Sequence, residues 1–99
     1  SLPVTYPSRE IKVYCPDNVK FKTMENISNE VLKNYNSKDI ITIDGIRAKN
    51  KFGWWLIRAS NTEEALVVRF EGNSAKDKNE LFNEVKYLLN NEGLTLETI

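Results

Sequence analysis

The residues best suited to chemistry lie in one short polar segment, residues 58–63, which reads Arg-Ala-Ser-Asn-Thr-Glu. One guanidinium, two hydroxyls, one side-chain amide and the backbone N–H groups place many hydrogen-bond donors close together in this segment. Donors concentrated in this way suit an anion with several oxygens, such as a phosphate or a carboxylate. The segment follows the apolar run 53–57 and precedes the largely apolar run 65–70, so we expect a loop between two strands.

The same segment contains a second pattern that would give it a different structure. Ser60, followed three residues later by Glu63, is the pattern of a capping box, and a helix would then begin after Ser60. Residues 67–70 read Val-Val-Arg-Phe, which favours a strand, and Gly72-Asn73 would end a helix too soon. We therefore favour a loop that leads into a strand.

Composition limits what the rest of the chain can contribute. With 99 residues the chain can fold as one domain around its own core, but it is short for a complete enzyme with a deep cleft. Lys+Arg and Asp+Glu number 14 each, so no net charge attracts nucleic acid or an anionic membrane. Histidine, the commonest general base, is absent. We therefore expect a binding module whose anion site is built by local geometry.

Cysteine usage and hydropathy indicate the compartment. The lone Cys15 cannot form an internal disulfide, and no apolar run reaches the roughly 18 residues of a membrane span. There is no signal-peptide pattern either. These features predict a cytoplasmic protein without a membrane partner, in which Cys15 is a small apolar core residue.

The first half of the chain is expected to contain a linker, a strand and a helix. Residues 1–8 carry two prolines, which disfavour regular strand pairing and suggest a linker from a preceding domain. Residues 10–15 alternate polar and apolar side chains, as in a strand with one wet face. Asp17 or Asn18 would cap the following helix, which should end near residues 36–37. Its apolar stripe consists of Phe21, Met24, Ile27, Val31, Leu32 and Tyr35.

The second half is expected to contain several strands and a second helix. Residues 40–43 predict a short strand, and Asp44-Gly45 predicts a tight turn into a strand over 46–49. Ser74 is a good cap for the last helix, and Gly93 would end it. The stripe of that helix consists of Leu81, Phe82, Val85, Leu88 and Leu89.

The order of strand, helix, several strands and helix predicts an α+β fold. We expect an antiparallel sheet of four to five strands with both helices packed on one face. The folded domain should cover residues 9–93, and residues 94–99 should form a C-terminal tail.

Several motifs together resemble one known family. Asp44-Gly45-Ile46-Arg47, Gly53-Trp54, the segment 56–63 and the strand 66–71 are similar to the C-terminal domain of the α-D-phosphohexomutases, the family of phosphoglucomutases and phosphomannomutases. The likeness covers nearly the whole chain. It implies a TATA-binding-protein-like fold, which agrees with the order of elements predicted above.

The resemblance implies a part of an intramolecular phosphotransferase with four domains. In this family a phosphoserine of the first domain donates its phosphoryl group to a sugar phosphate, and the other phosphate of the bisphosphate intermediate then returns to the serine. The second domain binds Mg²⁺ and the third binds sugar hydroxyls. The resemblance therefore implies that this domain acts with three others on a hexose 1-phosphate or 6-phosphate, binds no metal and carries no catalytic nucleophile.

Matched residue by residue, the resemblance assigns the polar loop to the phosphate that is not reacting. Arg58 would bind phosphate oxygens through its guanidinium fork. Ser60 and Thr62 would donate hydroxyl or backbone hydrogen bonds, and Asn61 would add its N–H and its amide. Glu63 would accept loop N–H groups or steady Arg58, unless it is a solvated surface carboxylate. Because the intermediate binds in two orientations, the loop should recognise phosphate and ignore the sugar.

The loop departs from the family pattern at one position. Glu64 stands where the family usually has proline, so the unbound loop loses the restraint of the ring. A second carboxylate near a phosphate dianion is also unfavourable unless it points to solvent. Asn61 stands where phosphoglucosamine mutases typically have glycine, so we favour mannose or glucose phosphates as substrates.

Two further groups of side chains have less specific interpretations. Arg47, Lys49 and Lys51 would extend a positive rim toward the phosphate or, more simply, form a solvated hairpin face. Trp54 and Trp55 are adjacent, so they should point to opposite faces of a strand, one of them into the core.

Two functions of other classes remain as alternatives. An exposed aromatic face beside Lys51 and Arg58 could stack the bases of a single-stranded nucleic acid, although the neutral net charge argues against this. The chain could also be a free-standing interaction domain.

Overall fold

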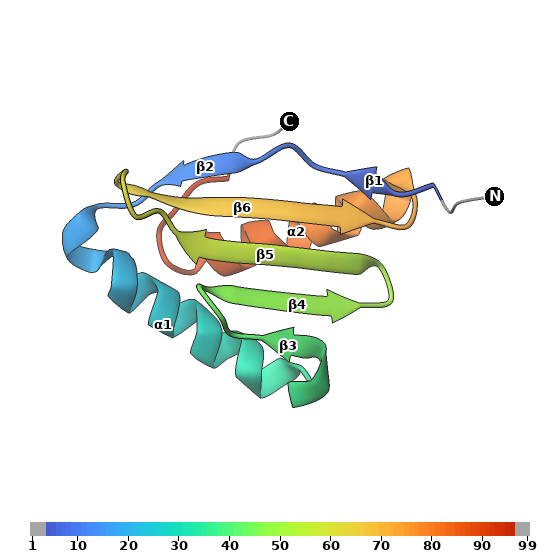
Figure 1. The fold of residues 1–99 in the computed structure, drawn as a ribbon, viewed down its shortest axis with the longest axis horizontal. Helices are drawn as coiled ribbons and strands as arrows, with labels where there is room; N and C mark the ends of the chain where they lie inside the picture. The colour runs from blue at the N-terminus through green and yellow to red at the C-terminus, as the bar shows by residue number, and fades with distance from the viewer. Residues whose placement is uncertain (1–3, 97–99) are drawn as a thin grey trace.

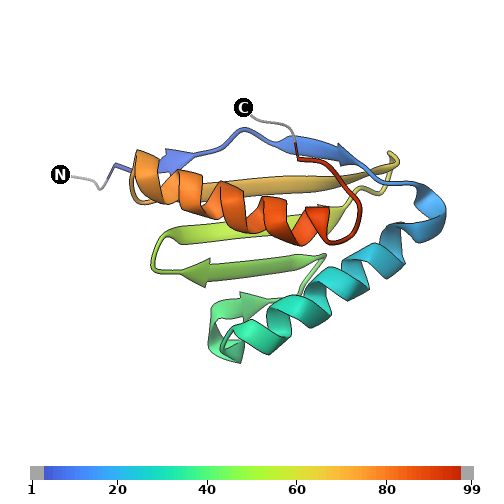
Figure 2. The same cartoon turned by 180° about the vertical axis from the view of Figure 1, so that it is seen from behind.

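One antiparallel sheet forms one layer of the molecule, and two helices form a second layer on one of its faces (Figures 1 and 2). This is a computed structural model that describes residues 4–96. The α+β class, the antiparallel sheet and the two helices on one face are confirmed. The strands are β1 (Tyr6–Pro7), β2 (Ile11–Tyr14), β3 (Ile40–Ile41), β4 (Ile46–Asn50), β5 (Gly53–Ala59) and β6 (Ala65–Gly72), and the helices are α1 (Asp17–Asn34), α2 (Ala75–Asn90) and the short 3₁₀ turn η1 (Ser37–Asp39).

The sheet has six strands in the order β1-β6-β5-β4-β3, with β2 also paired to β6. The extra strand relative to the expected four or five is β1, which lies in the predicted linker. Pro7 is tolerated there because β1 is at an edge, where the missing N–H is not needed by a second neighbour. Ser8 extends the pairing, since its N–H donates to the carbonyl of Phe70 at 2.7 Å and its Oγ accepts the Phe70 N–H at 2.9 Å. Residues 1–3 of the predicted linker lie outside the described residues.

Alternation along β5 divides its side chains between the two faces of the sheet. Trp55 and Ile57 are buried against the helices, and Trp54, Leu56 and Arg58 point to the opposite face. The Trp prediction is confirmed in this respect. The core also contains Cys15, as expected, together with Ile11, Val13, Met24, Ile27, Val31, Ile46, Ala48, Leu66, Val68, Phe70, Leu81, Val85, Leu88, Leu89 and Leu96.

Helix α1 buries a narrower and differently centred stripe than the sequence predicts. Its buried residues are Lys20, Thr23, Met24, Ile27 and Val31. The prediction that Phe21 and Leu32 are core residues is wrong, because their exposed fractions are 69% and 49%. At about 100° per residue both side chains lie on the flank of the buried stripe. Helix α1 crosses the sheet obliquely near one end of the strands, so the sheet covers only one side of the helix (Figure 1).

Helix α2 follows the sequence prediction closely. Ser74 caps it, with its Oγ accepting the N–H of Asp77 at 3.0 Å. The helix ends at Asn90, and Gly93 then adopts a left-handed φ of 76°. The Leu94 N–H bonds back to the carbonyl of Leu89 at 2.9 Å. Leu96, in the predicted tail, is buried in the core, and residues 97–99 lie outside the described part of the chain.

A polar cluster joins both helices to the centre of the sheet. The carboxylate of Glu84 on α2 accepts hydrogen bonds from the hydroxyl of Tyr35, from Asn50 Nδ2 at 3.0 Å and from Trp55 Nε1 at 3.1 Å. Burial, followed by the hydrogen bond to Glu84, raises the pKa of the Tyr35 hydroxyl. Each donor in the cluster therefore has an acceptor in a partly buried environment.

Candidate functional site

The polar loop lies at the end of the sheet where β5 passes into β6, close to the start of α1 (Figure 1). A cleft of about 360 Å³ opens beside it. The walls come from α1, from the turn before β4, from the end of β5 and from the loop; the lining residues are Phe21, Met24, Asp44, Gly45, Arg58, Ala59 and Asn61.

Arg58 is held at the cleft by strand pairing. It lies on β5 opposite Val67 of β6, and its side chain is partly exposed. Among the described residues no carboxylate lies within salt-bridge distance of its guanidinium. The fork of donors is therefore free to bind an anion.

The turn before β4 allows the backbone to approach Arg58 closely. Asp44 and Gly45 both have positive φ, 56° and 125°. A Cβ added to Gly45 would stand 2.5 Å from the carbonyl oxygen of Ile57 and 2.6 Å from Arg58 Cβ. The predicted turn is confirmed, but the strand before it ends at Ile41 and not at residue 43, because Ile43 already belongs to the turn that leads into β4.

Ser60 organises the loop from inside. It is 7% exposed, and its Oγ accepts the N–H of Thr62 at 3.3 Å and that of Glu63 at 3.1 Å. The second bond is the one a capping box would make, but no helix follows. Instead the Ser60 N–H donates to the carbonyl of Ala65 at 2.9 Å, and the chain continues into β6. The preference for a loop and strand over a helix is confirmed.

The buried ammonium of Lys20 on α1 holds two carbonyl groups of the loop. Lys20 on α1 is 5% exposed, and its Nζ lies 2.6 Å from the carbonyl oxygen of Ser60 and 3.1 Å from that of Glu63. Its third partner is the carboxylate of Asp17 at 2.9 Å. All three donors of the ammonium are satisfied, as a buried charge requires.

Glu63 has a different partner from those the sequence suggested. Its carboxylate forms a salt bridge with Lys12 of β2 at 2.6 Å, and both side chains are about half-exposed. The hydrogen bond with Glu63, followed by its charge, raises the pKa of the Lys12 ammonium. Glu63 thus neither steadies Arg58 nor accepts loop N–H groups in this structure. An exposed pair of this kind contributes little to stability.

Glu64 caps helix α1. Its Oε2 accepts the N–H of Asp17 at 3.2 Å, and its carbonyl accepts the N–H of Cys15 at 2.9 Å. Pro16 occupies the N-cap position of the helix and provides no side-chain cap, contrary to the prediction that Asp17 or Asn18 does so. A carboxylate at this end is favourable because the first N–H groups of a helix lack partners and carry partial positive charge. The side chain therefore has a structural partner on α1.

The structure separates the predicted site residues into two groups. Arg58 and Asn61 line the cleft. Ser60 is buried beneath the loop, Thr62 is exposed, and Glu63 is engaged with β2.

Sequence reasoning missed Lys20 and Phe21. Lys20 lies four, seven and eleven residues before Met24, Ile27 and Val31, so it belongs to the apolar stripe of the helix. A lysine at such a position was the signal that its ammonium would be buried and would need hydrogen-bond partners. Phe21 was expected in the core, but it forms a wall of the cleft.

The basic residues of the hairpin lie on or near the open face of the sheet. The guanidinium of Arg47 lies 4.4 Å from the ring centroid of Trp54. Lys51 lies over Phe52 at 5.2 Å, outside the group of residues that lines the cleft. One face of the Trp54 ring is therefore already covered by a cation and is not free for a base to stack on it.

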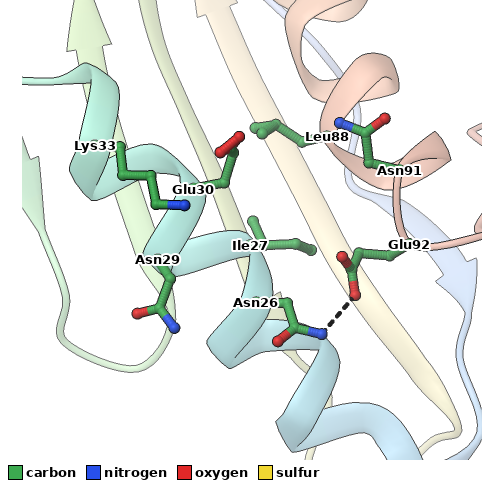
Figure 3. Close-up of a pocket in the computed structure, with 8 residues that line it drawn as sticks. All are labelled: Asn26, Ile27, Asn29, Glu30, Lys33, Leu88, Asn91 and Glu92. Carbon is green, nitrogen blue, oxygen red and sulfur yellow. Dashed lines mark hydrogen bonds between the residues drawn. The ribbon is translucent and has the colours of Figure 1, made fainter.

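A second cleft of about 360 Å³ separates α1 from α2 (Figure 3). Asn26 Nδ2 donates to Glu92 Oε1 at 3.0 Å across it. The lining is of mixed charge and contains no predicted site residue; it consists of Asn26, Ile27, Asn29, Glu30, Lys33, Leu88, Asn91 and Glu92. Its donors are three side-chain amides and one ammonium, and the carboxylates of Glu30 and Glu92 lie among them, which disfavours an anion.

Residues 4–96 also lack two other kinds of feature. None of the helices they form is both long and apolar enough to cross a membrane. No group of three or more His, Cys, Asp or Glu side chains in this range could hold a metal ion. This part of the chain therefore does not fit a Mg²⁺ site.

Residues 10–87 match the family model described as "Phosphoglucomutase/phosphomannomutase, C-terminal domain". A solved structure of a phosphoglucomutase/phosphomannomutase family protein from Burkholderia thailandensis superposes with a TM-score of 0.70 at 24% identity, over 89% of this chain and 18% of that one. That likeness concerns the fold.

Curated relatives carry a different name. A phosphoglucosamine mutase of Methanococcus maripaludis is 46% identical over 78% of this chain and 16% of its own length. A probable phosphoglucosamine mutase of Thermococcus gammatolerans is 36% identical over 85% of this chain and 19% of its own length. This chain thus spans less than a fifth of the length of these relatives. The expected preference for mannose or glucose phosphates is not confirmed by them.

Proposed function

Because this chain belongs to the phosphoglucomutase/phosphomannomutase C-terminal domain family, we propose that its loop 58–63 binds the non-reacting phosphate of a hexose phosphate. The observation that carries the proposal is that Arg58, whose guanidinium has no carboxylate partner among the described residues, lines a cleft together with Asn61. Hydrogen bonds to charged groups contribute roughly 1.5 to 3 kcal/mol each, so an arginine fork and a few N–H donors can hold a phosphate when the site is closed.

The geometry of the loop supports a separate role for each of its residues. Arg58 and the backbone N–H of Asn61 make the direct contacts with phosphate. Ser60, buried beneath the loop, fixes it by accepting two N–H groups. Thr62 is exposed at the tip and closes on the phosphate with its hydroxyl. Glu63 holds the loop to β2 through Lys12 and makes no direct contact.

The chemical step belongs to other parts of a longer protein. The relatives are several times longer than this chain, which covers 16% to 19% of their length. We propose that the segment ahead of β1 connects the folded domain to a preceding domain, and that groups outside this chain supply the phosphoserine, the Mg²⁺ site and the sugar contacts. The cytoplasmic location likewise stays a prediction.

The proposed substrate is a hexosamine phosphate, interconverted between its 1-phosphate and 6-phosphate. The names of the curated relatives support glucosamine phosphate. A second candidate is mannose or glucose phosphate, which the asparagine at position 61 favours. Both have the phosphate that the loop would bind.

The test is a comparison of the three sugars with the full-length protein that contains this chain. Phosphorus NMR would follow conversion of the 1-phosphates of glucosamine, glucose and mannose in the presence of Mg²⁺ and a trace of bisphosphate. We expect conversion of at least one sugar, with the highest kcat/KM for glucosamine phosphate. Higher turnover of mannose or glucose phosphate would favour the second candidate, and no conversion of any of them would reject the mutase assignment.

A further inference from the structure

The peptide groups of the loop do not all face the same way, and Lys20 determines how two of them lie. Its Nζ donates to the carbonyl oxygens of Ser60 at 2.6 Å and of Glu63 at 3.1 Å. The described peptide bonds include no cis bond, so the C=O and N–H of each peptide group point in opposite directions. The N–H groups joined to these two carbonyls, those of Asn61 and Glu64, therefore point away from the ammonium.

These N–H groups are also the free donors of the loop. The N–H groups of Thr62 and Glu63 donate to Ser60 Oγ, and that of Ala65 donates to the Glu63 carbonyl. Within residues 4–96, the N–H groups of Asn61 and Glu64 donate to no protein acceptor. The buried ammonium thus holds the carbonyl ends of the two peptide groups whose amide ends remain available.

We propose that Lys20 is the positioning residue of the phosphate loop: it fixes the Ser60–Asn61 peptide so that the Asn61 N–H faces the anion beside Arg58. This rests on the function proposed above for the loop. The cation also polarises the peptide, because withdrawal of electron density from the carbonyl oxygen makes the N–H a stronger donor.

Helix α1 is itself fixed to the far end of the loop. Glu64 Oε2 accepts the Asp17 N–H, and Asp17 in turn accepts a hydrogen bond from Lys20. The restraint that a proline at position 64 would supply through its ring is supplied here by contacts with the first turn of α1. The loop is therefore anchored to α1 at both ends, at Ser60 through Lys20 and at Glu64 through Asp17.

Substitution of Lys20 by methionine tests the proposal, because methionine keeps the apolar stem and removes the three donors. The matched control is Lys22→Met on the same helix, where the lysine is exposed and pairs with Glu25. In the full-length protein we expect K20M to lower kcat/KM about tenfold or more, chiefly through a higher KM, with K22M unchanged. Lys20→Arg should restore part of the loss, since it keeps the charge and donors.

A spectroscopic test separates positioning from general stability. In the chain of 99 residues, titration with inorganic phosphate should shift the Asn61 and Glu64 amide resonances, and the Thr62 and Glu63 amides should move little. In K20M the Asn61 shift should be lost although the core resonances stay dispersed. Equal Asn61 shifts in K20M and the parent chain would overturn the proposal.

A measurement on the unaltered chain covers the case in which K20M does not fold. A scalar coupling across the hydrogen bond should connect Lys20 Nζ with the carbonyl carbon of Ser60, and its absence at low temperature would overturn the proposal. Failure of this inference also differs from failure of the proposed function. If Arg58→Ala lowers kcat/KM and K20M behaves as K22M does, only the role of Lys20 is rejected; if neither variant changes it, the phosphate role of the loop is rejected too.

Discussion

Gly45 lies directly against Arg58, so closely that a Cβ on the glycine would stand 2.6 Å from the Cβ of the arginine. The two residues are neighbours because β4 and β5 pair in a register that places Ile46 opposite Ile57. The Asp-Gly turn and the arginine therefore form one structural unit, although they lie 13 positions apart in the chain.

Replacing Gly45 with alanine should displace Arg58 and destabilise the domain. The new Cβ would lie 2.5 Å from the Ile57 carbonyl oxygen, and the φ of 125° is itself unfavourable for alanine. We expect a loss of about 1 to 3 kcal/mol in the free energy of unfolding for the backbone strain alone. Chemical denaturation would measure it. The matched control is Gly93→Ala, where φ is 76° and the space is open; equal losses in both variants would show that contact with Arg58 has no part in the effect.

Replacing Arg58 with alanine should weaken phosphate binding without unfolding the domain. The side chain is partly exposed and forms no salt bridge with a described carboxylate, so its loss leaves no buried partner unsatisfied. In the full-length protein we expect kcat/KM to fall about tenfold or more, equivalent to about 1.4 kcal/mol of transition-state binding. Arg9→Ala, which removes an exposed arginine from the link between β1 and β2, should leave kcat/KM unchanged. Unchanged turnover of sugar 1-phosphates by R58A would contradict the role of the loop.

Replacing Glu64 should destabilise the domain more than replacing its neighbour Glu63. Glu64 caps the first turn of α1, and removal of a cap costs about 0.5 to 2 kcal/mol. Glu63 forms a half-exposed ion pair with Lys12, and exposed pairs of this kind contribute little to stability. Denaturant unfolding of E64A, E64Q and E63A should rank E64A lowest, with E64Q between the other two because its amide oxygen still accepts a hydrogen bond. A more stable E64A than E63A would contradict the capping role.

Tyr35 should make the stability of the domain depend on pH in the alkaline range. Burial and the hydrogen bond to Glu84 raise the pKa of its hydroxyl above the ordinary value of 10.0. The stabilisation is complete below pH 10.0 and is lost as the pH rises through the folded-state pKa, because the unfolded chain releases its proton first. Thermal melts from pH 8 to 11 should therefore show a smaller alkaline decrease for Tyr35→Phe than for the parent, so that the two Tm values differ most at pH 8 and converge as the pH rises. Tyr14→Phe, which alters an exposed tyrosine, should retain the parental pH dependence; a parental dependence in Y35F would contradict the assignment.

The sequence alone determined the class of fold and the place of the loop. The stripe of α2, the Ser74 cap and the Asp44-Gly45 turn depend on neighbours in the chain, so local patterns predict them well. The composition of residues 58–63 likewise indicated an anion site before any geometry was known.

Tertiary structure decided how the loop is held. Only the crossing of α1 over the end of the sheet places Lys20 beneath Ser60, 40 positions away in the chain, and turns Phe21 out of the core. The partners of Glu63 and Glu64 were decided in the same way. Their carboxylates bind Lys12 and the start of α1, because strand pairing brings β2 beside β6 and so places the start of α1 next to the loop. Contacts of this kind depend on the packing of distant segments, which no local pattern encodes.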